Sequence, residues 1–161
     1  MLVLLRPIDP KDLDAVAQVL MDETIRKTYM VPDLTYDTAM ALAGRFAALS
    51  QDKSRYVRGI YAEGALVGWL NDTEISGDSL ELGWVIHPQH QNRGYATAAV
   101  KAAIDELFQK GFRQVAAGAF ENNIASQRVM EKAGMIRLDK TEFIEYRGSI
   151  HRCVFYAIRN D

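Results

Sequence analysis

The sequence has few of the features that mark secreted or membrane proteins. Its 161 residues include one cysteine, Cys153, so no disulfide can form within the chain and a reducing cytoplasm is the expected location. No apolar run approaches the length that spans a membrane. The short apolar start lacks the basic segment and long apolar core of a signal peptide. We therefore expect neither a membrane span nor a membrane partner.

The sequence also lacks an excess of charge of either sign. Its 19 Lys and Arg residues against 21 Asp and Glu residues give a net charge of -2, without the basic footprint that nucleic acids or anionic membranes require. The 48% hydrophobic content is that of a globular protein with a sizeable core. Repeats, linkers and low-complexity segments are absent, so a single domain over residues 1–161 is expected.

The hydrophobic pattern predicts an α/β (α+β) fold. Alternating runs predict strands over residues 2–8, 56–62, 65–74, 80–86, 115–120, 135–146 and 150–158. Helical spacing predicts helices over residues 10–22, 36–50, 97–110 and 123–133. A strand, a helix and a strand in succession imply a parallel pair, formed by the fourth and fifth strands. We expect a mixed, mostly antiparallel sheet of about six to seven strands flanked by about four helices.

The six residues Gln91–Ala96 join a predicted strand to a predicted helix. The first N–H groups of a helix have no acceptor within it and lie at the positive end of its dipole. Such a terminus binds phosphate without a basic side chain. Gly94 lacks the Cβ that would hold a ligand away from the backbone. The turn therefore predicts a site for the pyrophosphate of a nucleotide-containing cofactor, with an ordinary helix start as the alternative.

Two common phosphate-binding patterns do not occur at this turn. No Gly-Lys-Ser/Thr follows Gly94, which excludes the Walker A loop. The dinucleotide pattern G-x-G-x-x-G is not present either, and no acidic residue stands at the separation that binds ribose. A different nucleotide-binding α/β protein is for this reason the weaker alternative.

A second set of motif residues follows the next predicted strand, over Asn123–Met135. With it, the sequence resembles the GNAT superfamily of acyl-CoA-dependent N-acetyltransferases. Gln91, Gly94 and Ala96 match that family's first motif, Gln/Arg-x-x-Gly-x-Gly/Ala. Its second motif, Asn-x-x-Ser/Ala followed by Glu-Lys-x-Gly-Phe/Met, is matched by Asn123, Ser126, Glu131, Lys132, Gly134 and Met135. The segment Leu80–Pro88 is similar to the branch that includes ribosomal-protein N-terminal acetyltransferases.

The resemblance implies that acetyl-CoA is the co-substrate and that no metal is needed. Backbone amides would cradle the coenzyme A pyrophosphate beside Gln91 and Asn92, and these amides are those of Arg93, Gly94, Tyr95, Ala96 and Thr97. Arg128 would reach the 3′-phosphate, with a solvated helix face as its alternative.

The resemblance also assigns the pantetheine arm. The backbone of Val85, Ile86 and His87 would pair with it like a strand. That pairing needs an unpaired strand edge, which in this family arises where the fourth and fifth strands splay apart. Asn123 would bond the arm or bridge the splayed strands, with a plain helix N-cap as its alternative. Ser126 would face the sulfur, with a surface or packed small residue as its alternative.

The implied chemistry is direct attack of a free amine on the thioester carbonyl. Since an alkyl amine is mostly protonated at neutral pH, a base or a water chain must take its proton. Glu81, on the central strand, is the candidate base, and a half-exposed strand glutamate is its alternative. A backbone N–H near Val85 or Ile86 would stabilise the oxyanion. Many family members protonate the thiolate with a tyrosine where this chain has Met130, so Ser126, water or no acid would serve here.

Two functions follow from the resemblance. The first is an acetyl-CoA-dependent N-acetyltransferase, whose amine acceptor is a protein N-terminus or a small molecule. The second is a non-catalytic acyl-CoA-binding or sensing module, which Met130 favours. Acceptor contacts are expected from residues 23–34 and from the closing hairpin, whose free edge strand would also allow a homodimer.

Overall fold

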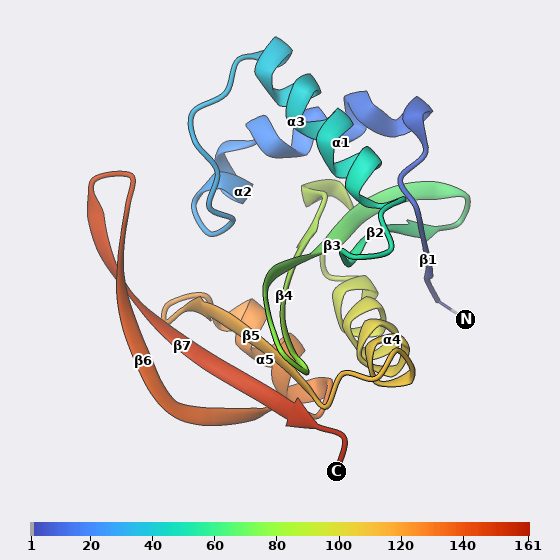
Figure 1. The fold of residues 1–161 in the computed structure, drawn as a ribbon. Helices are drawn as coiled ribbons and strands as arrows, with labels where there is room; N and C mark the ends of the chain where they lie inside the picture. The colour runs from blue at the N-terminus through green and yellow to red at the C-terminus, as the bar shows by residue number, and fades with distance from the viewer. Residues whose placement is uncertain (1) are drawn as a thin grey trace. The chain divides into compact units, whose positions relative to one another are not determined.

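The computed structural model describes residues 2–161, and their strands form one mixed seven-stranded sheet (Figure 1). The strands are β1 Leu4–Arg6, β2 Val57–Ala62, β3 Ala65–Ser76, β4 Ser79–Ile86, β5 Gln114–Phe120, β6 Ile136–Tyr146 and β7 Ser149–Arg159. The α-helices are α1 Leu13–Met21, α2 Glu23–Arg26, α3 Tyr36–Leu49, α4 Tyr95–Gln109 and α5 Ile124–Lys132, with 3-10 turns η1 Pro10–Asp12 and η2 Pro88–His90. The sheet order is β1-β2-β3-β4-β5-β7-β6. The expected fold class is confirmed, and the fifth helix is the short α2.

Helix starts lie where the capping residues predict them. Thr35 and Thr38 form a capping box, in which each backbone N–H donates to the other residue's hydroxyl, at 2.8 and 3.2 Å. Asp9 accepts the Lys11 N–H at 3.0 Å, and Pro10 follows it at the first helical position. The helix predicted from Pro10 begins as a 3-10 turn and becomes an α-helix at Leu13.

The parallel pair is short. The ladder between β4 and β5 runs from Ser79–Gln114 to Glu81–Ala116, whereas β5 pairs with β7 along its whole length, from Gln114 to Phe120. The antiparallel hairpins β2–β3 and β6–β7 close through tight turns, and their central residues have positive φ: Glu63 52°, Gly64 80°, Arg147 52° and Gly148 78°. Because its ladder with β5 ends at Glu81, β4 does not pair with β5 from Leu82 onward.

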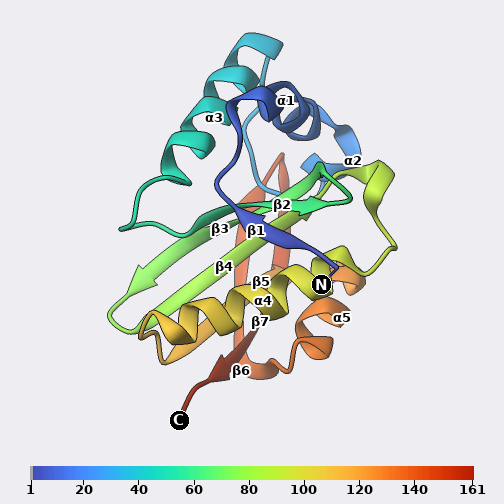
Figure 2. The ribbon, with the colours of Figure 1, turned by 90° about the vertical axis from the view of Figure 1, so that its right-hand side faces the viewer.

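The chain divides into two compact units, and the prediction of a single domain stays a prediction. The first unit comprises the chain up to Asn71 together with Trp84–Ala99. In it α1 and α3 lie side by side (Figure 2), joined by a 2.6 Å hydrogen bond from the Tyr36 hydroxyl to Asp14. Its core is formed by Ile8, Val16, Val19, Leu20, Ile25, Val31, Ala43, Val57, Trp69 and Val85. Val85 is buried like its neighbour Ile86.

The second unit comprises Asp72–Gly83 and Val100–Asp161, and its most extended element is the β6–β7 hairpin (Figure 1). Phe120, Cys153 and Phe155 form a small cluster there, against Ile144 and Tyr146. Cys153 is thus a small buried core residue, as expected. Burial raises the pKa of its thiol, and the charge of Glu142 acts in the same direction.

The close approach of Gly68 to the Val85 backbone gives a stability test. A Cβ on Gly68 would lie 2.0 Å from the Val85 carbonyl oxygen, whereas one on Gly44, in α3, would meet nothing within 4 Å. We expect Gly68→Ala to lower the free energy of unfolding by about 1–3 kcal/mol or more. Gly44→Ala should raise it by about 0.5–1 kcal/mol, because alanine is the better helix former. Urea unfolding followed by circular dichroism measures both, and equal midpoints for the two variants would contradict the packing argument.

Candidate functional site

The end of β4 uses one of its two edges to bind β3. The His87 N–H donates to the Val67 carbonyl at 2.7 Å, and the Val85 carbonyl oxygen is the atom nearest to where a Gly68 Cβ would lie. Backbone groups of successive strand residues point to opposite edges. The N–H and C=O of Ile86 therefore point to the edge of β4 that faces away from β3. This is the kind of edge that the predicted strand-like pairing requires.

Gln91 binds this same edge. Its side-chain amide donates to the Ile86 carbonyl at 3.0 Å. The sequence predicts Gln91 beside the pyrophosphate, and the structure places its amide on the strand that precedes the turn. Of the two outward groups of Ile86, the carbonyl already accepts a hydrogen bond from Gln91. The other outward group is the Ile86 N–H.

The turn after Gln91 has the backbone geometry of an anion cradle. Asn92 and Gly94 both have positive φ, 64° and 81°, a conformation that asparagine and glycine adopt most readily. The Ala98 N–H donates to the Gly94 carbonyl at 3.1 Å, so the N–H groups just before Ala98 have no acceptor within α4. Because α4 has 15 residues, its dipole adds positive charge at this end.

The side chains of the predicted cradle differ in exposure. Arg93 and Gly94 are exposed, Ala96 and Thr97 are half-buried, and Tyr95 is buried. The nearest atom to a Gly94 Cβ would be a Leu2 methyl carbon at 3.8 Å. The turn therefore needs glycine at this position for its φ angle, since space is available for a side chain. Arg93 and Gly94 thus lie at the surface, at a helix start of the kind that suits a pyrophosphate.

His87 follows β4 and caps η2 with its side chain. Its Nδ1 accepts the Gln89 N–H at 3.1 Å, and its ring centroid lies 5.5 Å from that of His90. Burial is the main cause that lowers the pKa of His87, the charge of His90 lowers it further, and Asp22 opposes both. The neutral imidazole is accordingly the form that the fold favours.

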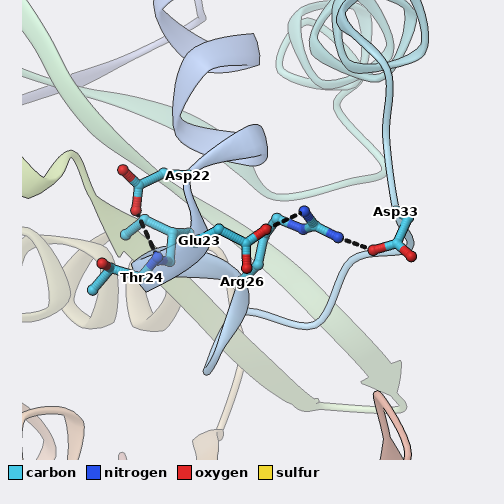
Figure 3. Close-up of polar contacts among 6 residues, drawn as sticks. Asp22, Glu23, Thr24, Arg26 and Asp33 are labelled. Atoms are coloured by element: carbon cyan, nitrogen blue, oxygen red, sulfur yellow. Dashed lines mark hydrogen bonds and ion pairs between the residues drawn. The ribbon is translucent and has the colours of Figure 1, made fainter.

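Residues 23–34, which are expected to contact the amine acceptor, begin with α2 and are held by ionic contacts. Asp22 caps α2 by accepting the N–H groups of Thr24 and Ile25 at 2.9 and 3.1 Å. The buried Arg26 guanidinium lies between two carboxylates (Figure 3), that of Glu23 at 2.8 Å and that of Asp33. These contacts tie the end of the following loop back to α2.

Tyr29 fixes the same loop to β3. The Trp69 indole N–H donates to the Tyr29 hydroxyl at 3.0 Å, and this hydroxyl donates to Asn71 at 2.9 Å. The two rings meet edge to face, with centroids 5.8 Å apart. Burial raises the pKa of Tyr29 to about 12, although the Trp69 hydrogen bond lowers it. The hydroxyl thus keeps its proton and its donor role at neutral pH.

Glu81 lies in the second unit, at the last residue pair of the parallel ladder. Its carboxylate accepts a hydrogen bond from the Thr73 hydroxyl at 2.9 Å, and the residue is half-buried. A carboxylate with one neutral donor keeps lone pairs that can accept a proton. The role of Glu81 as a base stays a prediction, and Thr73 is a neighbour that the sequence did not indicate.

Asn123 is the N-cap of α5. Its side-chain oxygen accepts the Ser126 N–H at 3.2 Å, and its own N–H donates to the Phe120 carbonyl at 2.8 Å. The cap uses the oxygen and leaves the Nδ2 group as the part of the side chain that can donate. Of the other predicted α5 residues, Ser126 is half-buried and Arg128 is exposed.

Met130 is completely buried in α5, at 0% exposure. It therefore packs as a core residue, and neither its chemistry nor its location suits a proton donor. The expectation that this position supplies no acid is consistent with the packing.

A pocket that the sequence did not indicate lies at the end of β5. It is lined by Phe120, Glu121, Asn122, Ile150, His151 and Arg152. The His151 ring stacks on that of Phe120 with centroids 4.2 Å apart, and Glu121 pairs with Arg152 at 3.1 Å. These residues come from two segments separated by about 30 positions, so only the β5–β7 pairing brings them together.

The comparisons with known proteins agree with this arrangement. A model of the acetyltransferase (GNAT) domain family matches residues 3–136. The chain belongs to the GNAT acetyltransferase family. This GNAT chain is 29% identical over 137 residues to the uncharacterized N-acetyltransferase YnaD of Bacillus subtilis (strain 168), covering 84% of this chain and 79% of that protein.

Solved structures share the fold of this GNAT chain. An acetyltransferase (GNAT family) from Bacillus anthracis has a TM-score of 0.85 at 25% identity, over 99% of this chain and 95% of that one. RimL, a ribosomal L7/L12 alpha-N-protein acetyltransferase solved in complex with coenzyme A, has a TM-score of 0.86 at 18% identity, over 99% and 94%. At that identity the likeness to RimL shows the fold alone.

The described residues of this GNAT chain provide neither a metal site nor a membrane-spanning helix. Within residues 2–161, no group of three or more His, Cys, Asp or Glu side chains is placed to hold a metal ion. In the same part of the chain, no helix has the length and apolar character needed to cross a membrane.

The environment of His87 predicts a pH effect on the stability of this GNAT protein. The folded-state pKa of His87 is lowered, so the unfolded chain binds more protons just below the ordinary histidine pKa of about 6.5. Stability should therefore fall as the pH drops from about 6.5 toward the lower folded-state value. His87→Asn, which can still accept the Gln89 N–H, should lose less stability over that window. Thermal unfolding between about pH 5 and pH 8 measures this.

His90→Asn is the matched variant for this test. It removes the charged neighbour but leaves His87 half-buried, so it should reduce the acid-induced loss without abolishing it. Identical pH profiles for the wild-type and His87→Asn proteins would show that His87 does not cause the effect.

Proposed function

We propose that this protein transfers an acetyl group from acetyl-CoA to a primary amine, which is a protein N-terminus or the amine of a small molecule. The observation that carries the proposal is the cradle after β4. A strand with outward-pointing Ile86 groups leads into a turn with two left-handed residues, and the turn opens the 15-residue α4. Phosphate and amide-bearing groups in one ligand match these two features. Coenzyme A contains both.

Each predicted contact has a chemical role in holding the donor. The amides of residues 93–97 bind the pyrophosphate, and Arg128 pairs with the 3′-phosphate. The Ile86 N–H donates to the pantetheine arm, while Gln91 orients the Ile86 carbonyl as an acceptor. Asn123 donates through Nδ2 to a pantetheine carbonyl, because its oxygen caps α5. Acetyl-CoA supplies the thioester.

Glu81 takes the proton of the acceptor ammonium, and the free amine then attacks the thioester carbonyl. A backbone N–H at the end of β4 stabilises the oxygen that gains negative charge. Ser126 or water protonates the departing thiolate. The family's usual tyrosine is replaced here by the buried Met130, which has no proton to donate. The thiolate is also a good leaving group without an acid.

The acceptor contacts belong to the segment after α2 and to the β6–β7 hairpin. RimL is a ribosomal-protein acetyltransferase by its description, which puts protein N-termini among the acceptors to test first. We further expect the protein to act in the cytoplasm, and a homodimer through β6 stays a prediction, since β6 is the outermost strand of its sheet.

A non-catalytic acyl-CoA sensor is the second candidate, and the buried Met130 is the observation that favours it. A sensor needs the cradle and the cap of α5 but no base or acid. Both functions therefore predict binding of acetyl-CoA, and only the acetyltransferase predicts transfer of the acetyl group.

Ligand binding and turnover test the two functions in sequence. We expect acetyl-CoA and coenzyme A to raise the melting temperature, whereas NAD and ATP should not. Thiol release is then followed with a panel of peptides, polyamines and other small amines. Stabilisation by NAD or ATP alone would overturn both functions, and binding without amine-dependent thiol release would select the sensor.

Glu81→Gln tests the base. We expect kcat at neutral pH to fall roughly 100-fold with an unchanged KM for acetyl-CoA, and the loss should shrink at alkaline pH, where the amine is free. Glu74→Gln, an exposed change of the same kind on β3, is the control. Equal rates for the Glu81→Gln and wild-type enzymes at neutral pH would remove Glu81 from this role.

Asn123→Asp separates the two functions of Asn123. Aspartate still caps α5 but cannot donate, so the melting temperature should hold while the Kd for coenzyme A rises about tenfold. Asn123→Ala loses the cap as well, at a cost of about 1 kcal/mol in stability. If the aspartate variant binds coenzyme A as tightly as wild type, Asn123 is only a cap.

A further inference from the structure

A single buried amide holds the turn between β5 and α5. Gln127 lies on the first turns of α5 and is 8% exposed. Its Nε2 donates to the carbonyl of Glu121 at 2.8 Å, to that of Asn123 at 3.3 Å and, more weakly, to that of Phe120 at 3.5 Å. The side chain thus reaches back to all but one of the carbonyls of residues 120–123.

The Glu121 carbonyl receives its hydrogen bond from Gln127, whereas the Phe120 and Asn123 carbonyls also accept backbone N–H groups. Three carbonyl oxygens that converge on one point repel each other, and burying one without a donor costs about 1–3 kcal/mol. The other ties of the turn are backbone bonds, from the Asn123 N–H to Phe120 at 2.8 Å and from the Glu121 N–H to Arg152 at 2.7 Å. Gln127 is the side chain that brings the carbonyls of the turn together.

The turn determines where Asn123 points. The Asn123 carbonyl accepts from the Gln127 side chain at 3.3 Å and from the Gln127 backbone N–H at 3.4 Å, and its side chain caps Ser126. A shift of the turn would move the Nδ2 group of Asn123 away from the pantetheine carbonyl to which it is proposed to donate. It would also move Glu121 and Asn122, which line the pocket at the end of β5.

We propose that Gln127 is a positioning residue for coenzyme A binding, acting through the β5–α5 turn on Asn123. The inference rests on the proposed function, because Asn123 must bind the cofactor for its orientation to matter. It goes beyond the family motif, which specifies Asn123 and Ser126 and leaves the position of Gln127 unassigned.

Gln127→Glu gives a readout that a purely structural role would not produce. An ionised glutamate offers no donor to the three carbonyls, whereas a protonated one offers a single O–H. We expect the Kd for coenzyme A to rise about tenfold at pH 8 relative to wild type and to approach the wild-type value near pH 5.5. Gln127→Leu, which never donates, should bind weakly at both pH values.

Gln109→Glu is the matched control, since Gln109 is an exposed glutamine of α4. It should follow the wild-type protein at both pH values and so corrects for titration of the ligand. Calorimetric titration with coenzyme A is run where circular dichroism shows each variant folded. Hydrogen exchange of the Asn123 N–H, which donates to Phe120, reports on the turn without any ligand and should accelerate in both Gln127 variants.

The outcomes separate the two proposals. Wild-type protein that does not bind coenzyme A would overturn the proposed function, and this inference with it. Wild-type binding with an unchanged Kd in both Gln127 variants would overturn the positioning role alone. The positioning role would also be overturned if Gln127→Glu binds coenzyme A weakly at both pH values while Gln127→Leu binds it with wild-type affinity. In that case the loss of the donor would not be the cause of the weak binding.

Discussion

The backbone of β4 at Val85–His87 is the constraint on which the candidate site depends. Gly68 lets β3 approach the Val85 carbonyl closely, and Val67 accepts the His87 N–H. Once β3 occupies this edge, the polar groups of Ile86 must point the other way. Gln91 then uses one of them to start the turn that opens α4. A strand edge and a helix terminus follow from one set of backbone contacts.

Buried polar side chains act as anchors for loops in both units. Tyr29 holds the loop after α2 to β3, Arg26 ties the end of that loop to α2, and Gln127 holds the turn before α5. Each anchor satisfies groups that the bare loop would leave unpaired, so removing one costs more than a surface contact would. The segments that would meet the ligands are thus held by hydrogen bonds, and in the loop after α2 the buried Val31 adds apolar packing.

Local signals account for most of what the sequence predicted. The capping residues Asp9 and Thr35 and the hairpin turns each act on residues a few positions away, and the strand–helix–strand crossover follows from the order of neighbouring elements. The short helix α2 escaped prediction because four residues are too few to show a period. Partners far apart in the chain escaped as well, such as Tyr29 with Asn71, which are separated by 42 positions. Gln127 was missed although it lies four residues after the N-cap, one helical turn away.

The turn at Gly94 excludes side chains by handedness and not by size. Its φ is 81°, yet a Cβ would find its nearest neighbour 3.8 Å away. For an L-residue this conformation is strained, whereas a D-residue occupies it naturally. A chemically synthesised chain with D-alanine at position 94 would therefore keep the backbone of the turn and lose the freedom that glycine has when unfolded. Position 94 in this sense suits a mirror-image residue, and glycine is the residue that a ribosomally made chain can place there without strain.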